Sequence, residues 1–298
     1  MSGKDEEEMV TNRWFMDSET GELADVLLCP PDHYAWIPSN DIAIQSMAGG
    51  AILDRTALKA QFDGLVALLR AERVSCHFLT PQPGMPYEVY TRDSSQTTPF
   101  GTVVTNLARP ERRAETGPVR AFYAGDEIWK TCTRGHIEGG DIHIIRPGLL
   151  AVGVSGGRTD EGGAAEFISW FEEAGWTCRM IRFPEHFLHL DVIFTMVAAD
   201  LAIAVVDVLD EADLDWLRAQ GIRVLPVSYR EAMRDMGCNV LSLGCERVVS
   251  PRHCTRINQM LRAEGLHVLE PELDQFSQGG GSIHCMTMPL RRKSLLPG

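Results

Sequence analysis

The chain has 298 residues, of which 44% are hydrophobic, and this proportion is sufficient for a large buried core. Its formal net charge of -13 lacks the basic surface that binding to a phosphate backbone requires, so no nucleic-acid partner is expected. No window approaches the roughly 20 apolar residues of a membrane helix, and the opening run MSGKDEEEMV lacks the features of a secretory signal. We therefore expect a cytoplasmic protein with no membrane partner.

The pattern of apolar residues alternates between the periods of strands and helices. Strands are predicted at 23–29, 74–79, 101–107, 149–155, 176–183, 192–198, 201–206, 222–227, 239–244 and 266–272. Helices are predicted at 55–73, 160–175, 210–219, 229–236 and 254–264, and loops at 31–54, 80–100, 108–140 and 273–283. The alternation predicts an α/β chain, and one compact domain is the simplest organisation because no linker-like segment divides it.

Eight cysteines are spread along the chain without a CxxC pair, and most have apolar neighbours. This pattern is typical of free thiols in a reducing compartment, where cysteine acts as a small hydrophobic residue. Most of the eight are therefore expected in the core.

One cysteine has a different setting. The segment SQGGGSIHCMTMPL places Cys285 shortly after three consecutive glycines, at the start of an apolar run. Glycines allow positive φ and close backbone approach, so Cys285 is a candidate nucleophile at the rim of a pocket. The alternative is a glycine-rich hairpin that leads into a strand, and by itself the segment favours that alternative.

The segment PEHFLHLDVIFTMV carries His186, His189 and Asp191 just before a predicted strand. Strand alternation would put His189 and Asp191 on one face, where they would supply a base and a carboxylate. The ordinary alternative is a histidine satisfied in the core beside a capping aspartate. Zinc is a third hypothesis, but no second cluster of matching spacing supports a metal site.

Two further segments combine acidic residues with turns. GHIEGGDIHII sets Glu138 and Asp141 around two glycines, where the backbone can approach a ligand closely. YEVYTRD places Arg92 and Asp93 at the end of a short strand. Solvated acids in a tight turn and a local ion pair are the ordinary explanations, so neither segment alone indicates a function.

Taken together, the segments TRD, EGGD, HLD and GGGxxHC resemble, in order and spacing, those of the guanidine-modifying enzymes, or penteins. This superfamily includes arginine deiminases, dimethylarginine hydrolases, arginine dihydrolases and amidinotransferases. The resemblance covers about residues 20–292 and implies a five-bladed ββαβ propeller in one catalytic α/β domain. We expect that domain at 16–292, between a mobile acidic N-terminal tail at 1–15 and a C-terminal tail at 293–298.

The resemblance also implies roles for particular residues. In the superfamily the cysteine after the glycines is the nucleophile, which implies that role for Cys285. The histidine of HLD is the acid and base, and the glutamate of EGGD supports the cysteine and the histidine, which implies these roles for His189 and Glu138. The aspartates of TRD and HLD bind the guanidinium, which implies Asp93 and Asp191. The implied partner is a small guanidino compound, with no metal and no other cofactor, and the sequence leaves the oligomeric state open.

The arginine deiminases hold the α-carboxylate of their substrate with two arginines. Here ARPERRAE offers Arg112 and SGGRT offers Arg158, so the resemblance favours a free amino acid over agmatine. One departure is Tyr87 in PYEVYTRD, where arginine deiminases and dimethylarginine hydrolases usually carry Asn or Asp near the α-amino end. The identity of the guanidino substrate therefore stays open.

The reaction implied is hydrolysis of a guanidinium through an S-alkylthiouronium intermediate, which gives a ureido product and ammonia or an amine. The same residues would support amidino transfer to an acceptor amine, or a second hydrolysis that gives ornithine, ammonia and carbon dioxide. A metal-dependent hydrolase and a non-catalytic binding protein are the alternatives from other classes. The complete set of five residues argues against the binding protein.

Overall fold

The computed structural model describes residues 13–123 and 127–296, and its strands form five separate sheets of three strands each. In each sheet the middle strand pairs antiparallel with one neighbour and parallel with the other. The orders are β15-β1-β2, β3-β4-β5, β6-β7-β8, β9-β10-β11 and β12-β13-β14. A helix precedes the parallel strand in every sheet, so the repeating unit is ββαβ.

The strands are β1 Leu23–Leu28, β2 Ser75–Phe78, β3 Ser95–Thr98, β4 Gly101–Val104, β5 Ile128–Thr131, β6 Ile142–Arg146, β7 Leu149–Val154, β8 Thr177–Arg182, β9 Phe194–Ala198, β10 Leu201–Ala204, β11 Arg223–Pro226, β12 Leu241–Gly244, β13 Arg247–Val249, β14 His267–Leu269 and β15 Met288–Arg292. The α-helices are α1 Asp41–Ala48, α2 Arg55–Ala71, α3 Thr116–Tyr123, α4 Glu161–Glu173, α5 Glu211–Ala219, α6 Tyr229–Asp235, α7 Thr255–Ala263 and α8 Asp274–Ser277. Short 3-10 turns are η1 Pro110–Glu115, η2 Gly139–Asp141, η3 Glu185–Phe187 and η4 Leu190–Val192.

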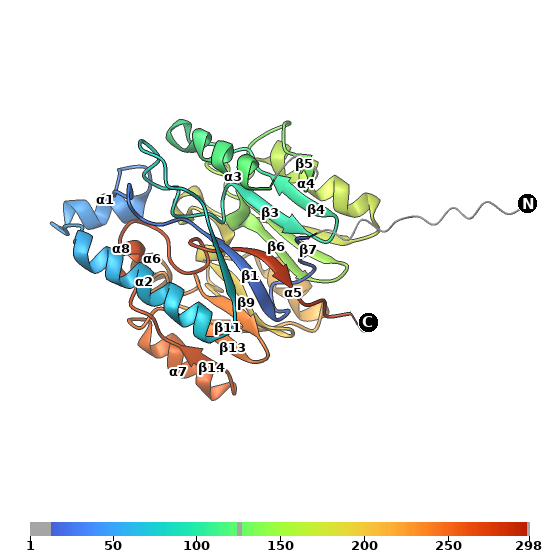
Figure 1. The fold of residues 1–298 in the computed structure, drawn as a ribbon. Helices are drawn as coiled ribbons and strands as arrows, with labels where there is room; N and C mark the ends of the chain where they lie inside the picture. Colours follow the sequence, from blue (N-terminus) through green and yellow to red (C-terminus); the bar gives the residue numbers. More distant parts are fainter. Residues whose placement is uncertain (1–12, 124–126, 297–298) are drawn as a thin grey trace, which may run out of the picture.

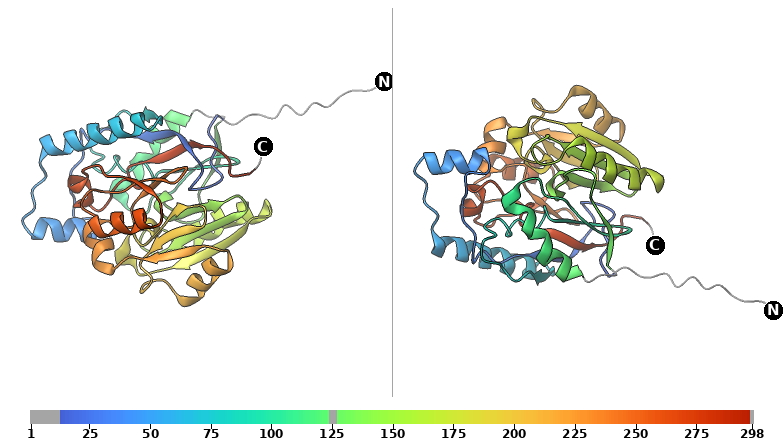
Figure 2. Two further views of the ribbon diagram at one scale, coloured as in Figure 1. Left: turned by 90° about the horizontal axis from the view of Figure 1, so that it is seen from below. Right: turned by 90° about the horizontal axis from the view of Figure 1, so that it is seen from above.

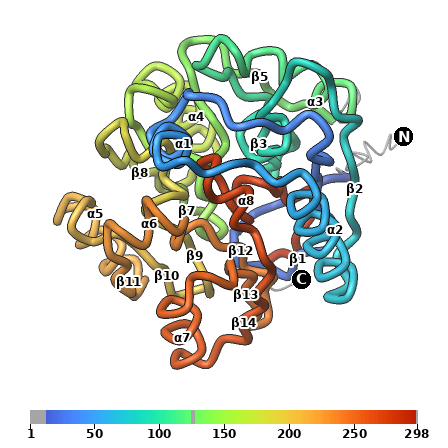
Figure 3. The backbone as a smooth tube through the Cα atoms, turned by 90° about the vertical axis from the view of Figure 1, so that its left-hand side faces the viewer, coloured from blue at the N-terminus to red at the C-terminus, as the bar shows by residue number. Residues whose placement is uncertain are grey.

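The two ends of the chain complete one blade. β15 pairs antiparallel with β1, with Leu27 opposite Met288, so the last strand closes the ring against the first. In Figure 3, α2, α3, α4, α5 and α7 lie at the periphery of the molecule. In Figure 1, α1, α6 and α8 gather at one end of it. This architecture confirms the five-bladed α/β propeller expected from the sequence.

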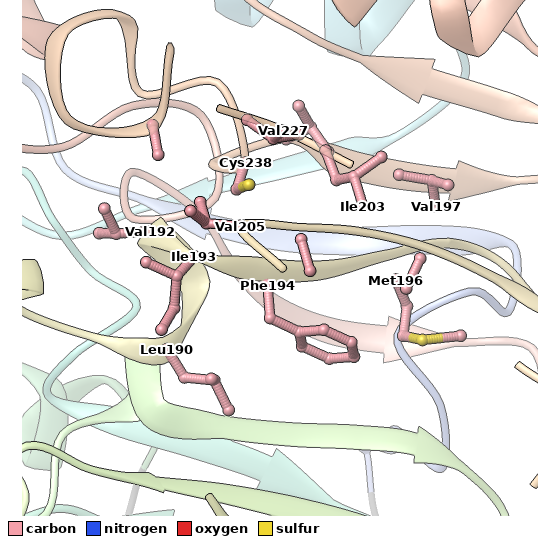
Figure 4. Close-up of a cluster of buried hydrophobic side chains, with 14 of the residues drawn as sticks. Leu190, Val192, Ile193, Phe194, Met196, Val197, Ile203, Val205, Val227 and Cys238 are labelled. Carbon is pink, nitrogen blue, oxygen red and sulfur yellow. The ribbon is translucent and has the colours of Figure 1, made fainter. Parts of the chain in front are cut away.

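Apolar side chains fill the space between the blades and the helices that cover them. The largest cluster surrounds β9 and β10, where Phe194, Met196 and Ile203 have at most 1% of their surface exposed (Figure 4). Burial of such side chains contributes about 1.5–3 kcal/mol each relative to exposure. This packing fixes the chain that runs from η4 into β9.

The interior also contains polar residues. All four residues of β3, Ser95–Thr98, are buried, and Glu19, Arg92 and His284 form a buried group of charged and polar side chains. Hydrogen-bonded strands can bury such residues because their backbone groups are paired. The polar strand β3 explains why a search for alternating apolar residues finds only a loop at 80–100.

Other elements also fall in segments that we expected as loops. α1 lies within 31–54, and α3 and β5 lie within 108–140. α1 and α3 have eight residues each, and α1 exposes Ile44 and Met47, so neither shows the long amphipathic pattern of α2. The predictions for these segments were wrong because the elements are short and only partly covered.

The chain ends differ in part from the expected tails. Residues 1–12 and 297–298 lie outside the described residues, but Trp14 is only 4% exposed and the Phe15 N–H donates to Leu290 O. Lys293 N–H also donates to Glu22 O. Phe15 and Lys293 thus bond to residues in or next to the strands of the first blade. Among the described helices, none combines the length and apolarity needed to cross a membrane.

The two-view ribbon shows how the segment before α1 runs beside α8 (Figure 2). Two contacts hold it there directly: the Trp36 indole donates to Gln275 O, and the Asn40 amide donates to Gly279 O. The Tyr87 hydroxyl bridges the two parts, because it lies 3.1 Å from Ile37 O and 3.2 Å from Gly279 O. Gly279, Gly280 and Gly281 permit this packing, because a Cβ at any of them would collide with Tyr34, Asn40 or Tyr90. The three glycines are thus needed for close packing within the chain.

Candidate active site

All five blades contribute a residue to one buried cluster, and each does so from the segment just before its first strand. Asp93 precedes β3, Glu138 precedes β6, His189 and Asp191 precede β9, and Cys285 precedes β15. The corresponding residue of the remaining blade is Asn239, which precedes β12. Equivalent positions in a propeller meet at one end of the ring, which is why segments almost 200 residues apart share one site.

Glu138 and His189 are in direct polar contact within the site. His189 Nε2 lies 2.7 Å from Glu138 Oε2, and Nδ1 lies 3.7 Å from Asp93 Oδ1. Although burial opposes the charged form, Asp93, Glu138 and Asp141 raise the pKa of His189 to about 9. Burial likewise opposes ionisation of Glu138, but Arg158, His189 and Arg112 hold its pKa well below the usual range. At neutral pH the pair is therefore an imidazolium and a carboxylate.

Cys285 lies in the same cluster and is 3% exposed. Its thiol donates to Asp191 Oδ2 at 3.4 Å, and its Sγ accepts from the Asn239 amide at 3.1 Å. Burial, followed by the charges of Asp191 and Asp93, raises the pKa of Cys285 well above that of an ordinary thiol. The free protein therefore holds a neutral thiol here.

Asn239 was not recognised in the sequence, and it fixes the loop that carries Cys285. Its side-chain oxygen accepts the backbone N–H groups of Ser282, His284 and Cys285 at 3.0, 3.1 and 3.2 Å. Its amide nitrogen faces Cys285 Sγ. The sequence GCNVLSLG carries no glycine–acid signature, and only the equivalence of the five blades would have pointed to Asn239.

Two carboxylate oxygens in the site lack a hydrogen-bond partner among the described residues. Asp191 Oδ2 accepts from His284 Nδ1 at 2.8 Å and Asp93 Oδ2 from Arg112 at 2.6 Å, but Oδ1 of each aspartate is buried and unpaired. Such groups are costly to bury, and in a binding site they indicate a missing donor. These two oxygens are thus suited to a ligand with N–H groups.

The two arginines expected to bind substrate both lie in the site, but in different settings. Arg112 is 3% exposed and bonds to Glu115 and Asp93. Arg158 contacts Glu138 Oε2 at 3.4 Å and Ser39 O at 3.3 Å, and its Nε has no partner within the described chain. Arg158 is therefore the less engaged of the two.

The turn before His189 is strained. Leu188 has φ of 68° and ψ of -81°, and the His189 N–H donates to Phe187 O at 2.9 Å across it. This is a γ-turn of the rare form, and such backbone strain often occurs at functional sites. The turn and η4 correct our expectation that His189 and Asp191 alternate along a strand: the strand begins only at Phe194.

The two glycines of EGGD, Gly139 and Gly140, are needed for close packing against other residues of the protein. A Cβ on Gly139 would strike the backbone of Arg92, and one on Gly140 would lie 2.9 Å from the His189 ring. We expected a close approach to a ligand at these glycines, but the close approach is to His189 and Arg92. Asp141 turns inward and accepts the Leu190 N–H at 2.7 Å, and its burial raises its pKa to about 7.

A cavity of about 20 Å³ reaches Cys285, and its lining includes Asp93, His189, Arg158 and Tyr87. An outer pocket of about 530 Å³ shares Asn40, Arg158 and Leu188 with it. A hollow of about 640 Å³ on α2 lies apart from these residues. The small cavity and the outer pocket together form the candidate site.

A metal is a poor fit to these residues. His186, His189 and Asp191 do not bring their donor atoms together anywhere in the described chain, so the sequence-based zinc hypothesis was wrong. Asp93, Glu138 and His189 do converge, but Arg112 and Arg158 already contact two of their carboxylates. Two guanidinium groups beside the cluster would repel a cation.

The fold and the cysteine-centred cluster define the class of the protein as a guanidine-modifying enzyme of the pentein superfamily. It belongs to the dimethylarginine dimethylhydrolase family, because the family model of eukaryotic N,N-dimethylarginine dimethylhydrolase matches residues 39–292. Members of this family and the related arginine deiminases act on guanidino C–N bonds.

Individual relatives agree with this assignment. The uncharacterized protein YkgA of Bacillus subtilis is 30% identical over 278 residues, which cover 92% of this chain and 94% of YkgA. An arginine deiminase of Listeria monocytogenes is 28% identical over 266 residues, and the match spans 73% of this chain but 63% of that enzyme.

Solved structures share the fold at lower identity. Dimethylarginine dimethylaminohydrolase from Pseudomonas aeruginosa, as a cysteine-to-serine variant with citrulline, is 18% identical with a TM-score of 0.75, covering 90% of this chain and 99% of its own. The N-terminal domain of ArgZ, a cyanobacterial arginine dihydrolase, is 19% identical with a TM-score of 0.77, covering 90% of this chain and 98% of its own.

Proposed function

We propose that the protein hydrolyses the guanidinium group of a small arginine-type compound, with Cys285 as the nucleophile. The observation that supports this proposal is a pair of unpaired carboxylate oxygens: Asp93 Oδ1, on a residue that lines the small cavity with Cys285, and Asp191 Oδ1, on the carboxylate that accepts from the Cys285 thiol. A guanidinium is planar, cationic and rich in N–H donors, so it supplies both the hydrogen bonds and the charge that these oxygens lack.

Substrate binding would also activate the nucleophile. The thiol of Cys285 is neutral because burial and two aspartates disfavour its thiolate. A bound guanidinium offsets those two charges and brings a cation next to Sγ, which favours loss of the thiol proton. The Asn239 amide, which already donates to Sγ, would stabilise the thiolate as it forms.

In the first chemical step the thiol of Cys285 gives its proton to solvent, and Sγ forms a bond to the central guanidinium carbon. The tetrahedral adduct then breaks one C–N bond, and the departing nitrogen takes a proton from the His189 imidazolium. This leaves an S-alkylthiouronium on Cys285 and a neutral His189. Glu138, at 2.7 Å from Nε2, stabilises the imidazolium and orients the ring.

In the second step water replaces the nitrogen that departed, and His189 acts as a base instead of an acid. Neutral His189 removes a proton from water, whose oxygen attacks the thiouronium carbon. Cleavage of the C–S bond then releases the thiolate of Cys285, which takes the remaining O–H proton of the product, so that the ureido group and the neutral thiol form together. The products are a ureido compound and the ammonia or amine released in the first step. Attack by an acceptor amine instead of water would give amidino transfer, and a second hydrolysis would give the dihydrolase products.

The alkyl arm of the substrate would pass from the small cavity toward the outer pocket, where Arg158 is available to a carboxylate. We further propose a cytoplasmic location, which the eight free cysteines support.

The test is a survey of L-arginine, methylated arginines, agmatine and guanidino acids, in which ureido products, ammonia and amines are followed by mass spectrometry. The proposal predicts a ureido product from at least one compound, and its loss in the Cys285→Ser variant. Product that forms only when an acceptor amine is added would show an amidinotransferase. Activity abolished by a chelator and insensitive to iodoacetamide would contradict the thiol mechanism.

A further inference from the structure

The outer pocket is lined by side chains of both charges. Arg109 and Arg158 are its guanidinium groups, and Asp41, Glu111 and Glu185 are its carboxylates. The pocket holds about 530 Å³ and shares part of its lining with the small cavity that reaches the nucleophile. A ligand group that carries one positive and one negative charge therefore suits this pocket better than a group with either charge alone.

Arg158 is the buried cation of this pocket. It is 3% exposed, and its Nε is buried without a hydrogen-bond partner among the described residues. The sequence resemblance implies that Arg158 and Arg112 hold the α-carboxylate of an amino acid. Since the α-ammonium is attached to the same carbon as the α-carboxylate, it would also lie at the outer pocket.

Glu185 packs directly against the residue that precedes Arg158. A Cβ built on Gly157 would collide with Cγ and Oε1 of Glu185, so the acid fills the space that the glycine leaves. Glu185 also opens η3, the turn that leads to the strained residue Leu188 and to His189. The glycine thus fixes the carboxylate of Glu185 at the wall of the pocket that also carries Arg158.

The carboxylate of Glu185 has a weak partner in the free protein. Its ion pair is with Arg109, whose Nη2 lies 3.7 Å from Oε1, which is longer than a hydrogen bond. The side chains of Arg109 and Glu185 are 39% and 63% exposed, and ion pairs in such settings contribute little to stability. Tyr87, in contrast, uses its hydroxyl within the chain, at 3.1 Å from Ile37 O and 3.2 Å from Gly279 O. Of these two acceptors, Glu185 is the one that can bind an ammonium without the loss of a hydrogen bond.

We propose that Glu185 is a specificity-determining residue, which binds the α-ammonium of a guanidino amino acid while the arginines hold its α-carboxylate. This inference rests on the proposed function, because it assumes that the guanidinium lies beside Cys285. An α-ammonium donates charge-assisted hydrogen bonds to a carboxylate, and an acylated nitrogen has neither the charge nor the same donors. The substrate class is therefore a guanidino amino acid with a free α-ammonium, and arginine with an acylated α-nitrogen is disfavoured.

Three guanidino ligands separate the two charges of the amino-acid end. L-arginine carries an α-ammonium and an α-carboxylate, agmatine keeps only the ammonium, and δ-guanidinovalerate keeps only the carboxylate. Their dissociation constants would be measured by calorimetry on Cys285→Ser protein, so that no turnover intervenes. Glu185→Gln removes the charge at nearly constant size. Gly157→Ala keeps Glu185 but displaces it, and Gly157 does not have a positive φ that alanine would avoid.

Glu185→Gln should weaken the binding of L-arginine and agmatine by a similar factor, about tenfold, and should not weaken that of δ-guanidinovalerate. Gly157→Ala should give the same pattern with a smaller factor, because the carboxylate is moved but not removed. Nα-acetyl-L-arginine should bind more weakly than L-arginine, and Glu185→Gln should reduce that difference. Glu111→Gln, which removes another exposed carboxylate of the same pocket, is the matched control and should weaken the binding of none of the ligands.

Unchanged binding of L-arginine and agmatine in Glu185→Gln would overturn the proposal, because the ammonium would then lie elsewhere. An equal loss for L-arginine, agmatine and δ-guanidinovalerate would also overturn it, since that pattern indicates a general structural effect. Turnover by the wild-type protein is scored separately. Binding that depends on Glu185 without turnover would contradict the hydrolase proposal alone, whereas no binding of any of these ligands would contradict both proposals.

Discussion

His189 Nε2 lies 2.7 Å from Glu138 Oε2, in a site where neither residue is more than 4% exposed. A histidine so placed is held as an imidazolium, which is the form that can protonate a departing nitrogen. Arg158 and Arg112 also face Glu138 Oε2, at 3.4 and 3.8 Å, so the carboxylate stays charged and stabilises the imidazolium. The protonated state of the proposed acid, His189, thus depends on Glu138 and on the two arginines that keep Glu138 charged.

The stability of the protein should depend on the charge of His189. Its pKa is raised from 6.5 to about 9, so its contribution to folding is fully present below pH 6.5 and is lost as pH rises through about 9. The melting temperature of the wild type should exceed that of His189→Gln by more at pH 6.5 than at pH 9. His267→Gln, at an exposed histidine of β14, is the control; an equal difference at both pH values would contradict the assignment.

Replacement of the proposed nucleophile should remove activity and retain the fold. Cys285→Ser should lower kcat at least ~10³-fold, because a serine hydroxyl in this setting has no strong base to activate it. Its melting temperature should stay within a few degrees of the wild type, since oxygen and sulfur fill similar space. Cys245→Ser, at an exposed thiol, should retain full activity. Turnover by Cys285→Ser near the wild-type rate would exclude the thiol mechanism.

Removal of a negative charge beside Cys285 should make its thiol more reactive. After burial, the negative charge of Asp191 is the strongest influence that raises the pKa of Cys285. Asp191→Asn should therefore lower that pKa and increase the fraction of thiolate. We expect carboxamidomethylation of Cys285 at pH 7.5 to be several-fold faster in the variant, measured by peptide mass spectrometry. The exposed Cys245 in the same sample is the internal reference. An unchanged or slower rate at Cys285 would refute the electrostatic account.

The amide of Asn239 should matter more for the nucleophile than for the fold. Asn239→Asp keeps an oxygen that can accept the three backbone N–H groups of the 282–285 loop, but it replaces the N–H that faces Sγ. The added charge would oppose the thiolate, so kcat should fall ~10–100-fold with a small change in melting temperature. A variant with full activity would show that Asn239 only supports the loop.

Much of the fold could be predicted from the sequence because four of the five blades keep an apolar middle strand and an amphipathic helix. The strand at 149–154 and the helix at 161–173 are examples, since both bury apolar faces. β3 could not be found in this way, because its buried residues are Ser, Gln and Thr. A search for alternating apolar residues cannot detect a buried strand whose side chains are polar.

The candidate site was predictable where a residue stands beside glycines or in a recognisable motif, as Glu138 and Cys285 do. Asn239 was missed because its neighbours are ordinary strand residues. The engagement of Arg112 by Glu115 was also invisible, since an arginine and a glutamate three residues apart resemble an exposed helical pair. Only tertiary structure shows that both are buried and that Asp93 completes the contact.

The central claim is that Cys285 forms a covalent bond to the substrate carbon, and trapping that adduct tests it most directly. Wild-type protein would be mixed with L-arginine and methylated arginines, quenched in acid within the turnover time, digested and analysed by mass spectrometry. The account predicts a thiouronium adduct on the peptide that contains Cys285, absent from the Cys285→Ser protein. Steady product formation without an adduct on that peptide, together with activity in Cys285→Ser, would contradict it.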